Sequence, residues 1–326
     1  MNRTSQSQTV PSPEHRTHPS DIECSVKTLV VGAGATGGYL GVHLIRAGRD
    51  VTFLARPRTL SRLTADGVRI QGRDGLSTTP VNAIATADLD GPYDVVLLAV
   101  RSDAVESATD DFRAAVGVHT RIVPMTNGMA HLSTLAKAFG EDAVLGATAK
   151  LATSLLPDGT IDEVVPGAQL EIGSLDGSQS DDISSMAKEF AVDGISVRTT
   201  NTVRVAMWEK FAFITTTAVL TCLAGDVIGP IARASGGTTL AVRILDEVDS
   251  VATAEGYPLS RPAKEALHGL LTDPTSSFGP SMFRDLRAGR PVETSVFSDL
   301  TARARHHDIA IPLVDAATVV IDVRGR

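Results

Sequence analysis

Residues 28–58, TLVVGAGATGGYLGVHLIRAGRDVTFLARPR, decide the fold. A short apolar run is followed at once by Gly32, Gly34 and Gly37 in the spacing G-x-G-x-x-G, then by a segment with helical periodicity and by a second apolar run at 50–56. This order of strand, glycine turn, helix and strand is the context in which the motif holds a pyrophosphate at the start of the helix. The stretch therefore predicts a dinucleotide site rather than an incidental glycine turn.

The end of the second apolar run indicates which dinucleotide is bound. In the NAD-binding version of this unit an acidic residue ends the second strand and holds the ribose hydroxyls. Here Ala55 stands at about that position, and Arg56 and Arg58 follow. A carboxylate would repel a ribose phosphate, whereas a guanidinium binds one bidentately. We predict NADP(H), with solvated loop charges as the alternative interpretation of the two arginines.

Composition limits the class of protein. A length of 326 residues suggests about two domains. The formal net charge of −8 disfavours nucleic acid as the partner. No apolar run reaches the roughly 18 residues that a membrane span needs. Cys24 lies in a polar tail and Cys222 in an apolar run, so no disulfide is expected, and no metal site is expected because no Cys/His cluster has ligand spacing.

The chain divides into three parts. Residues 1–24 are rich in Ser, Thr, Pro and His and lack the apolar centre of a secretory signal, which predicts a disordered extension and, by default, a cytoplasmic protein. Residues 25–201 alternate apolar strands with helices, which predicts a doubly wound α/β sheet with a helix over 102–117 and paired strands within 160–175. Residues 202–326 are predicted to be helical, with an ambiguous end. The apolar face of 239–256 belongs to the core or to a homodimer surface.

Five segments together resemble the ketopantoate reductase (2-dehydropantoate 2-reductase) family. They are VGAGATGG, VTFLARPRTLSRLTADGVRI, TNGM, MWEKF and PSMFRDLRAGRPVE, in the family's order. The resemblance covers nearly the whole chain from Val26 onward. It implies a Rossmann-type domain that binds NADPH, an all-helical domain that closes the cleft, and reduction of the keto group of 2-dehydropantoate.

The resemblance also implies roles for individual residues. Lys210 corresponds to the catalytic lysine, Glu293 to the acidic residue beside it and beside the nicotinamide ribose, and Ser281 to a serine that holds the substrate carboxylate. Arg101 stands where many members have a lysine. The expected cofactor contacts are Gly32, Gly34, Ala35, Thr36, Gly37, Arg56, Arg58, Arg101, Asn127, Ala152 and Glu293.

Simple chemistry gives these residues the same roles, and each also has a structural interpretation. An ammonium placed at the ketone oxygen can stabilise and then protonate the alkoxide that hydride addition leaves. Lys210 lies in an apolar helical run, where the alternative is a side chain that snorkels to the surface. The Asn127-Gly128 pair is otherwise a tight turn. Glu293 and Ser281 are otherwise a solvated helix-start charge and a helix cap.

The chain departs from the family along one helix stripe. Family members present asparagines four and eight residues after the lysine, and another in the following turn. Here these positions are Ile214, Ala218 and, roughly, Ile228, and of the nearby threonines only Thr217 and Thr221 lie close to the stripe. Unpaired polar atoms of a substrate would cost about 1–3 kcal/mol each against such a wall. We therefore expect Lys210, Ile214, Ala218 and Ser281 to meet a different or bulkier 2-oxo acid or ketone, and burial to lower the Lys210 pKa.

Two other classes of function compete with the reductase. One is a non-catalytic NADP-binding regulatory protein of the same fold, which would need neither Lys210 nor Glu293. The other is a 6-phosphogluconate-type or hydroxyacid dehydrogenase working in the oxidative direction, which the segments after Asn201 fit less well. The favoured prediction is an NADPH-dependent reductase of a 2-oxo acid or ketone, either a true ketopantoate reductase or a paralogue in another pathway, and the missing asparagines favour the paralogue.

Overall fold

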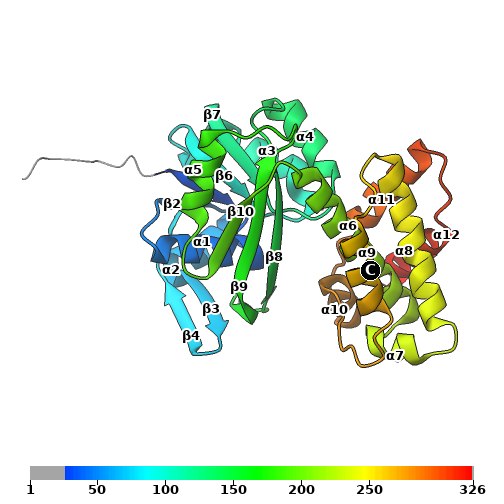
Figure 1. Ribbon diagram of the computed structural model, residues 1–326. Coiled ribbons are helices and arrows are strands. Elements are labelled where there is room, and N and C mark those ends of the chain that lie inside the picture. Colours follow the sequence, from blue (N-terminus) through cyan, green and yellow to red (C-terminus); the bar gives the residue numbers. More distant parts are fainter. Residues whose placement is uncertain (1–25, 325–326) are drawn as a thin grey trace, which may run out of the picture.

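The computed structural model describes residues 26–324, so the predicted disorder of residues 1–24 lies outside the described residues. An α/β domain and a helical domain lie side by side, and α6 leads from one into the other (Figure 1). The elements of the α/β domain are β1 Thr28–Val31, α1 Ala35–Arg46, β2 Val51–Leu54, α2 Pro57–Asp66, β3 Val68–Gly72, β4 Gly75–Thr79, β5 Asn82–Ile84, β6 Tyr93–Leu98, α3 Val105–Asp111, β7 Val116–Pro124, α4 Ala130–Phe139, β8 Leu145–Leu155, β9 Ile161–Ser174, α5 Asp181–Phe190 and β10 Ile195–Thr199.

The first sheet confirms the predicted nucleotide-binding architecture. Its strands are all parallel and follow the order β5-β2-β1-β6-β7. The strand order reverses beside β1, and open α/β sheets bind ligands at the carboxyl ends of the strands that flank such a point. The segments that follow β1, β2, β6 and β7 therefore define the edge where the site is expected.

The second sheet corrects the prediction of one sheet over 26–200. Its order is β10-β9-β3-β4, with β8 paired to β9. The predicted pair of strands within 160–175 is wrong, because β9 is a single strand of 14 residues whose antiparallel partner is β8. Only a short turn separates β8 from β9, so the two form a hairpin instead of continuing the parallel crossovers.

The helical domain contains the elements α6 Val203–Ala224, α7 Ile228–Arg233, α8 Gly237–Ala254, α9 Arg261–Leu271, α10 Ser281–Arg287, α11 Ser295–His306 and α12 Pro312–Arg324. The ambiguous chain end is thus a helix. The helix predicted over 102–117 is shorter than expected, because α3 ends at Asp111 and β7 already begins at Val116.

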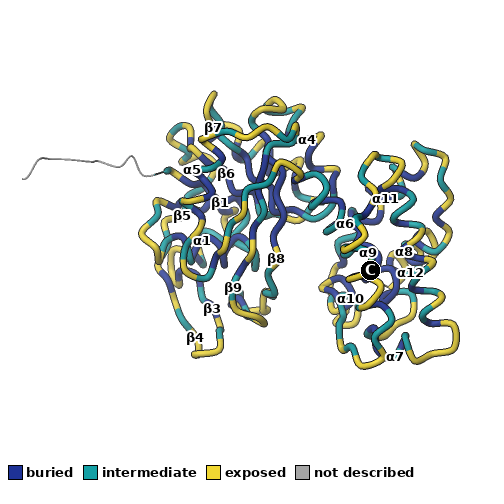
Figure 2. The backbone as a smooth tube through the Cα atoms, in the orientation of Figure 1, coloured by how far each residue is buried: buried dark blue, intermediate teal, exposed yellow. Residues whose placement is uncertain are grey.

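The core explains why α6 is apolar on every side. A helix that is apolar all round belongs in an interior, and α6 packs against α8, α10 and α12. One continuous cluster of buried side chains joins the α3–α4 side of the first sheet to the helical domain, and buried segments run through both (Figure 2). A second cluster lies between α1 and the two sheets. No helix within residues 26–324 has the length and apolarity to cross a membrane.

Candidate active site

The glycine turn leaves an open space at the start of α1. Gly32 has φ of +100°, and a Cβ there would lie 2.8 Å from the carbonyl oxygen of Ala99. A Cβ on Gly37 would lie 2.1 Å from the carbonyl oxygen of Gly32, so helix and turn touch at that position. A Cβ on Gly34 would meet nothing within 4 Å. With no acidic residue in its first turn, α1 presents backbone N–H groups to that space, as a pyrophosphate requires.

The two arginines after β2 are exposed at the start of α2. Arg56 donates through Nη2 to Ser107 Oγ at 2.9 Å and forms an ion pair with Asp111 at 3.5 Å. Arg58 makes no hydrogen bond or ion pair to any residue within 26–324. Ala55 is buried and contributes no acidic group. Of the two arginines predicted to contact the ribose phosphate, Arg58 is the one whose guanidinium has no partner among the described residues.

Glu293 joins the two domains. One carboxylate oxygen accepts hydrogen bonds from the backbone N–H and the hydroxyl of Ser102, at 2.8 and 2.6 Å. The other accepts from Asn127 Nδ2 at 3.4 Å. Ser102 follows β6 and Asn127 follows β7, while Glu293 precedes α11 of the helical domain. Three residues from separate parts of the sequence therefore meet at the ligand-binding edge of the first sheet.

Arg101 lies beside this junction. Its guanidinium donates to both carboxylate oxygens of Asp103 and to the carbonyl oxygen of Pro291 in the helical domain. Partial burial alone would lower the pKa of Arg101, but the hydrogen bond to Asp103 and the charges of Asp103, Glu293 and Asp285 outweigh burial and raise it. Arg101 is thus a permanent positive charge at the domain boundary.

Lys210 lies in the first half of α6, half-buried and without an ion-pair partner within 4 Å among residues 26–324. Burial lowers the pKa of its ammonium group to about 8, and the charge of Glu293 partly opposes that effect. This is the direction expected from the sequence. A lysine with such a pKa is partly deprotonated near neutral pH and exchanges protons readily.

The helix stripe after Lys210 differs from the expectation. Ile214 is half-buried, but Ala218 and Ile228 are fully buried and present no surface to a ligand in this structure. The hydroxyls of Thr217 and Thr221 donate to carbonyl oxygens of their own helix, so neither is free to bind a substrate. Only the first of the three stripe positions is available to line a cleft.

Phe213, which precedes Ile214 on α6, belongs to an aromatic pair. The rings of Phe213 and Phe278 lie 5.7 Å apart in an edge-on arrangement, and both side chains are only partly buried. Ser281 is exposed at the start of α10, which packs against α6. Ile214, Phe213 and Phe278 are thus partly exposed apolar side chains, and Ser281 is an exposed hydroxyl on a helix that contacts α6.

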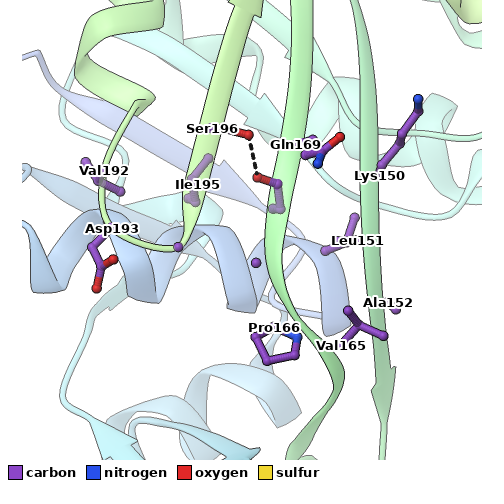
Figure 3. Close-up of a pocket in the computed structure, with 13 residues that line it drawn as sticks. Lys150, Leu151, Ala152, Val165, Pro166, Gln169, Val192, Asp193, Ile195 and Ser196 are labelled. Atoms are coloured by element: carbon purple, nitrogen blue, oxygen red, sulfur yellow. Dashed lines mark hydrogen bonds between the residues drawn. The ribbon is translucent and has the colours of Figure 1, made fainter.

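Two hollows differ in their relation to these residues. A cavity of about 170 Å³ lies at the domain boundary, and its lining includes Ser102, Asn127, His131 and Asp299. A larger groove of about 630 Å³ runs over β8, β9 and the start of β10 (Figure 3). Of the predicted site residues only Ala152 lines that groove. The smaller cavity adjoins the predicted chemistry.

Three residues at the boundary were missed by the sequence interpretation: Ser102, His131 and Asp299. Asp299 accepts hydrogen bonds from the backbone N–H groups of Met129 and Ala130, at 2.7 and 2.9 Å. His131 is buried, and neither of its ring nitrogens has a hydrogen-bond partner among residues 26–324. Burial lowers the pKa of His131 to about 4. A serine after a strand was the only local signal, since the other two residues gain their roles through contacts across the boundary.

Comparison with known proteins assigns the family. Residues 28–177 match the model "Ketopantoate reductase PanE/ApbA", and residues 202–324 match the model of the C-terminal domain of the same family. The chain belongs to this family. The resemblance inferred from five short segments is thereby confirmed.

Individual members of the family and of the fold are distant from this chain. The chain is 27% identical to the uncharacterized oxidoreductase YkpB of Bacillus subtilis, over 89% of this chain and 96% of YkpB. The crystal structure of 2-dehydropantoate 2-reductase from Geobacter metallireducens is 26% identical, with a TM-score of 0.81 over 91% of this chain and 99% of that one. D-mandelate dehydrogenase with NADH and anilino(oxo)acetate has the same fold at 15% identity, with a TM-score of 0.81 over 91% of this chain and 98% of that one. The family is therefore shown, and solved proteins with the same fold are named for different substrates.

Proposed function

We propose that this member of the ketopantoate reductase family reduces a 2-oxo acid with an apolar side chain to the hydroxy acid, using NADPH. The junction of Glu293 with Ser102 and Asn127 carries the proposal. It brings a carboxylate of the helical domain to the ligand-binding edge of the first sheet, near enough to Lys210 for its charge to act on the lysine pKa. A regulatory binding protein would have no need for this arrangement.

The residues present fit a nicotinamide dinucleotide phosphate. The open space at Gly34 and the free N–H groups at Ala35 and Thr36 suit the pyrophosphate. Arg58 suits the ribose phosphate, because it has no other partner among the described residues. Asn127 and Glu293 suit the nicotinamide ribose. The bound cofactor supplies the hydride.

Lys210 acts as the general acid. Its ammonium stabilises the negative charge that develops on the ketone oxygen, then donates a proton to it, and regains a proton from solvent. Glu293 keeps the ammonium charged by opposing the effect of burial on its pKa. Because the carboxylate is itself held by Ser102 and Asn127, it remains beside the lysine without taking its proton.

The apolar surface beside Lys210 sets the substrate class. Ile214 and the Phe213–Phe278 pair offer packing to an aliphatic or aromatic side chain. Ser281 and Arg101 are the polar groups suited to the substrate carboxylate, and Arg101 carries the stronger charge. A hydroxylated substrate such as ketopantoate would leave its hydroxyl unpaired against Ile214.

The test is oxidation of NADPH by the purified protein with ketopantoate and a series of longer and aromatic 2-oxo acids, with NADH as control. We expect turnover of the apolar substrates at least tenfold above that of ketopantoate. Fast turnover of ketopantoate would overturn the apolar-substrate proposal and retain the family's named reaction. Binding of NADPH without turnover of any substrate would favour the regulatory alternative.

An Ile214→Asn variant tests directly whether the apolar side chain at this position selects the substrate. The amide restores a hydrogen-bonding group four residues after Lys210, so activity on ketopantoate is expected to rise at least tenfold relative to that on an apolar 2-oxo acid. Thr217→Asn is the matched control, because that side chain is buried and bonded to its own helix. If the Ile214 variant gains no activity on ketopantoate, the side chain at this position does not select the substrate.

A further inference from the structure

Helix α4 receives its N-terminal cap from the other domain. Met129 and Ala130 begin α4, and no side chain from the described part of their own domain caps them. Instead the buried carboxylate of Asp299, in α11, accepts hydrogen bonds from both backbone N–H groups. The first N–H groups of a helix are otherwise unsatisfied, and a carboxylate also meets the positive end of the helix dipole. The contact thus satisfies α4 only while the two domains are in place.

The carboxylate of Asp299 also accepts a hydrogen bond within the helical domain. Its second oxygen accepts from Arg303 Nε at 2.8 Å. Arg303 forms an ion pair at 2.5 Å with Glu255, which directly follows α8, and its guanidinium lies 5.4 Å from the ring centroid of Trp208. We call Asp299, Arg303 and Glu255 the interdomain clamp. Trp208 lies on α6, two residues before Lys210, so the clamp reaches the helix that carries the proposed general acid.

The clamp also contacts the turn that carries Asn127. Gly128 has φ of +84°, and a Cβ there would lie 3.3 Å from Asp299 Oδ2, so the turn passes directly over the carboxylate. Asn127 precedes this glycine and donates to Glu293. The position of Asn127 therefore depends on a turn whose next two N–H groups are held by Asp299.

We propose that Asp299 and Arg303 form a positioning pair that fixes Asn127 and Lys210 relative to each other across the domain boundary. Neither residue acts on substrate or cofactor. The pair fixes the turn that carries Asn127 through Asp299, and the helix that carries Lys210 through the contact of Arg303 with Trp208. This inference rests on the proposed function, because Lys210 and Asn127 are assigned their roles there.

The test uses substitutions that separate the two halves of the pair. In Asp299→Asn the amide oxygen still accepts from α4, but the amide N–H groups face Arg303, so the cap survives and the link is lost. In Arg303→Met the cap survives and the contact with Trp208 loses its charge. Glu265→Gln is the matched control, because Glu265 forms an exposed ion pair with Arg261 in the same domain.

Three measurements are made on each variant: steady-state kinetics, tryptophan emission and the pH–rate profile. We expect kcat to fall at least tenfold in Asp299→Asn and Arg303→Met, with a smaller change in KM for NADPH. Trp208 is the only tryptophan in the chain, so its emission reports the state of the clamp, and we expect it to shift in both variants. The basic limb of the pH–rate profile is expected to move upward, because a displaced α6 admits water to Lys210. Of the titratable groups that act on this lysine, neither the carboxylate of Glu293 nor the neutral ring of His131 is altered in the two variants.

Two further outcomes separate failure of the inference from failure of the proposed function. The pH dependence of Lys210 acylation, read by peptide mass spectrometry, needs no turnover and is expected to shift upward in both variants. If the wild type turns over substrate while both variants keep its pH profile and lose only thermal stability, the pair is merely structural and the inference is wrong. If nothing turns over but Lys210 acylation and Trp208 emission shift as expected, the positioning stands and the reductase assignment fails.

Discussion

At the scale of the residue, the lowered pKa of Lys210 predicts the pH range of the proposed activity. Its pKa in the folded chain, about 8, lies below its ordinary value of 10.5 because of burial. The proposed general acid therefore loses its proton as pH rises through about 8, and we expect kcat to fall above that pH. The buried ammonium also costs stability below pH 8, and that cost is relieved as pH rises from about 8 to 10.5.

A Lys210→Met variant tests both consequences of this pKa. Turnover is expected to drop by about 10²–10⁴-fold. The melting temperature at pH 7 is expected to rise above that of the wild type, and the difference is expected to shrink by pH 10. A variant with a lower melting temperature at pH 7 would show that the ammonium is better solvated than its burial implies.

Arg58 gives a second prediction at this scale. Replacing it with alanine is expected to raise KM for NADPH about tenfold or more, as the loss of a charge-assisted hydrogen bond does. KM for NADH is expected to stay within twofold, because NADH lacks the ribose phosphate. Arg261→Ala, in an exposed pair on α9, is the control. Equal losses for both cofactors would assign Arg58 to the pyrophosphate or to the loop itself.

Single residues were predictable where their type alone is informative. Glycines in a fixed spacing after a strand, and a lysine within an apolar helix, point to chemistry without knowledge of their neighbours. Asp299 carries no such signal, and Ser102 carries only the weak one of a serine after a strand, because their roles depend on partners 170 and 191 residues away. The burial of Ala218 was missed for a related reason. Helical periodicity gives the face of α6 but does not say where along the helix the cleft ends.

At the scale of the element, the packing of α1 against the glycine turn predicts that two glycine-to-alanine substitutions differ in their effects on stability and on NADPH affinity. In Gly37→Ala the new Cβ would lie 2.1 Å from the Gly32 carbonyl, so helix and turn must separate, at a cost of about 1–3 kcal/mol in unfolding free energy. In Gly34→Ala the new methyl points into open space, so stability is expected to hold while affinity for NADPH falls. Urea unfolding and NADPH titration of both variants measure the two effects, and equal destabilisation would contradict the packing argument.

Elements were predictable where hydrophobic pattern and turn signals agree, as for β1, α1, β6 and α6. The sequence interpretation failed where strand pairing is decided by connection length. The apolar pattern at 160–175 reads equally well as two short strands or one long one. The short turn after β8 makes it one strand, because that turn returns the chain antiparallel along its neighbour.

At the scale of the whole molecule, His131 is expected to make the fold sensitive to acid. Burial lowers its pKa to about 4, from an ordinary value of 6.5. As pH falls from 6.5 towards 4 the unfolded chain binds a proton that the native one does not, so stability declines, by up to roughly 3 kcal/mol for a shift of this size. His131→Phe is expected to flatten this decline between urea unfolding at pH 7 and at pH 5. The exposed His268→Gln is the control, and an unchanged decline in the Phe variant would assign the acid sensitivity elsewhere.

The cap that Asp299 provides has a consequence for the order in which the protein is made. Ala130 leaves the ribosome 169 residues before Asp299, so α4 is synthesised long before the carboxylate that completes it. During that interval the α3–α4 side of the first sheet lacks the helical-domain residues that later complete its core. The nucleotide-binding half is therefore made before both the cap of α4 and part of its own core, and we expect it to gain its full stability only after α11 has been synthesised.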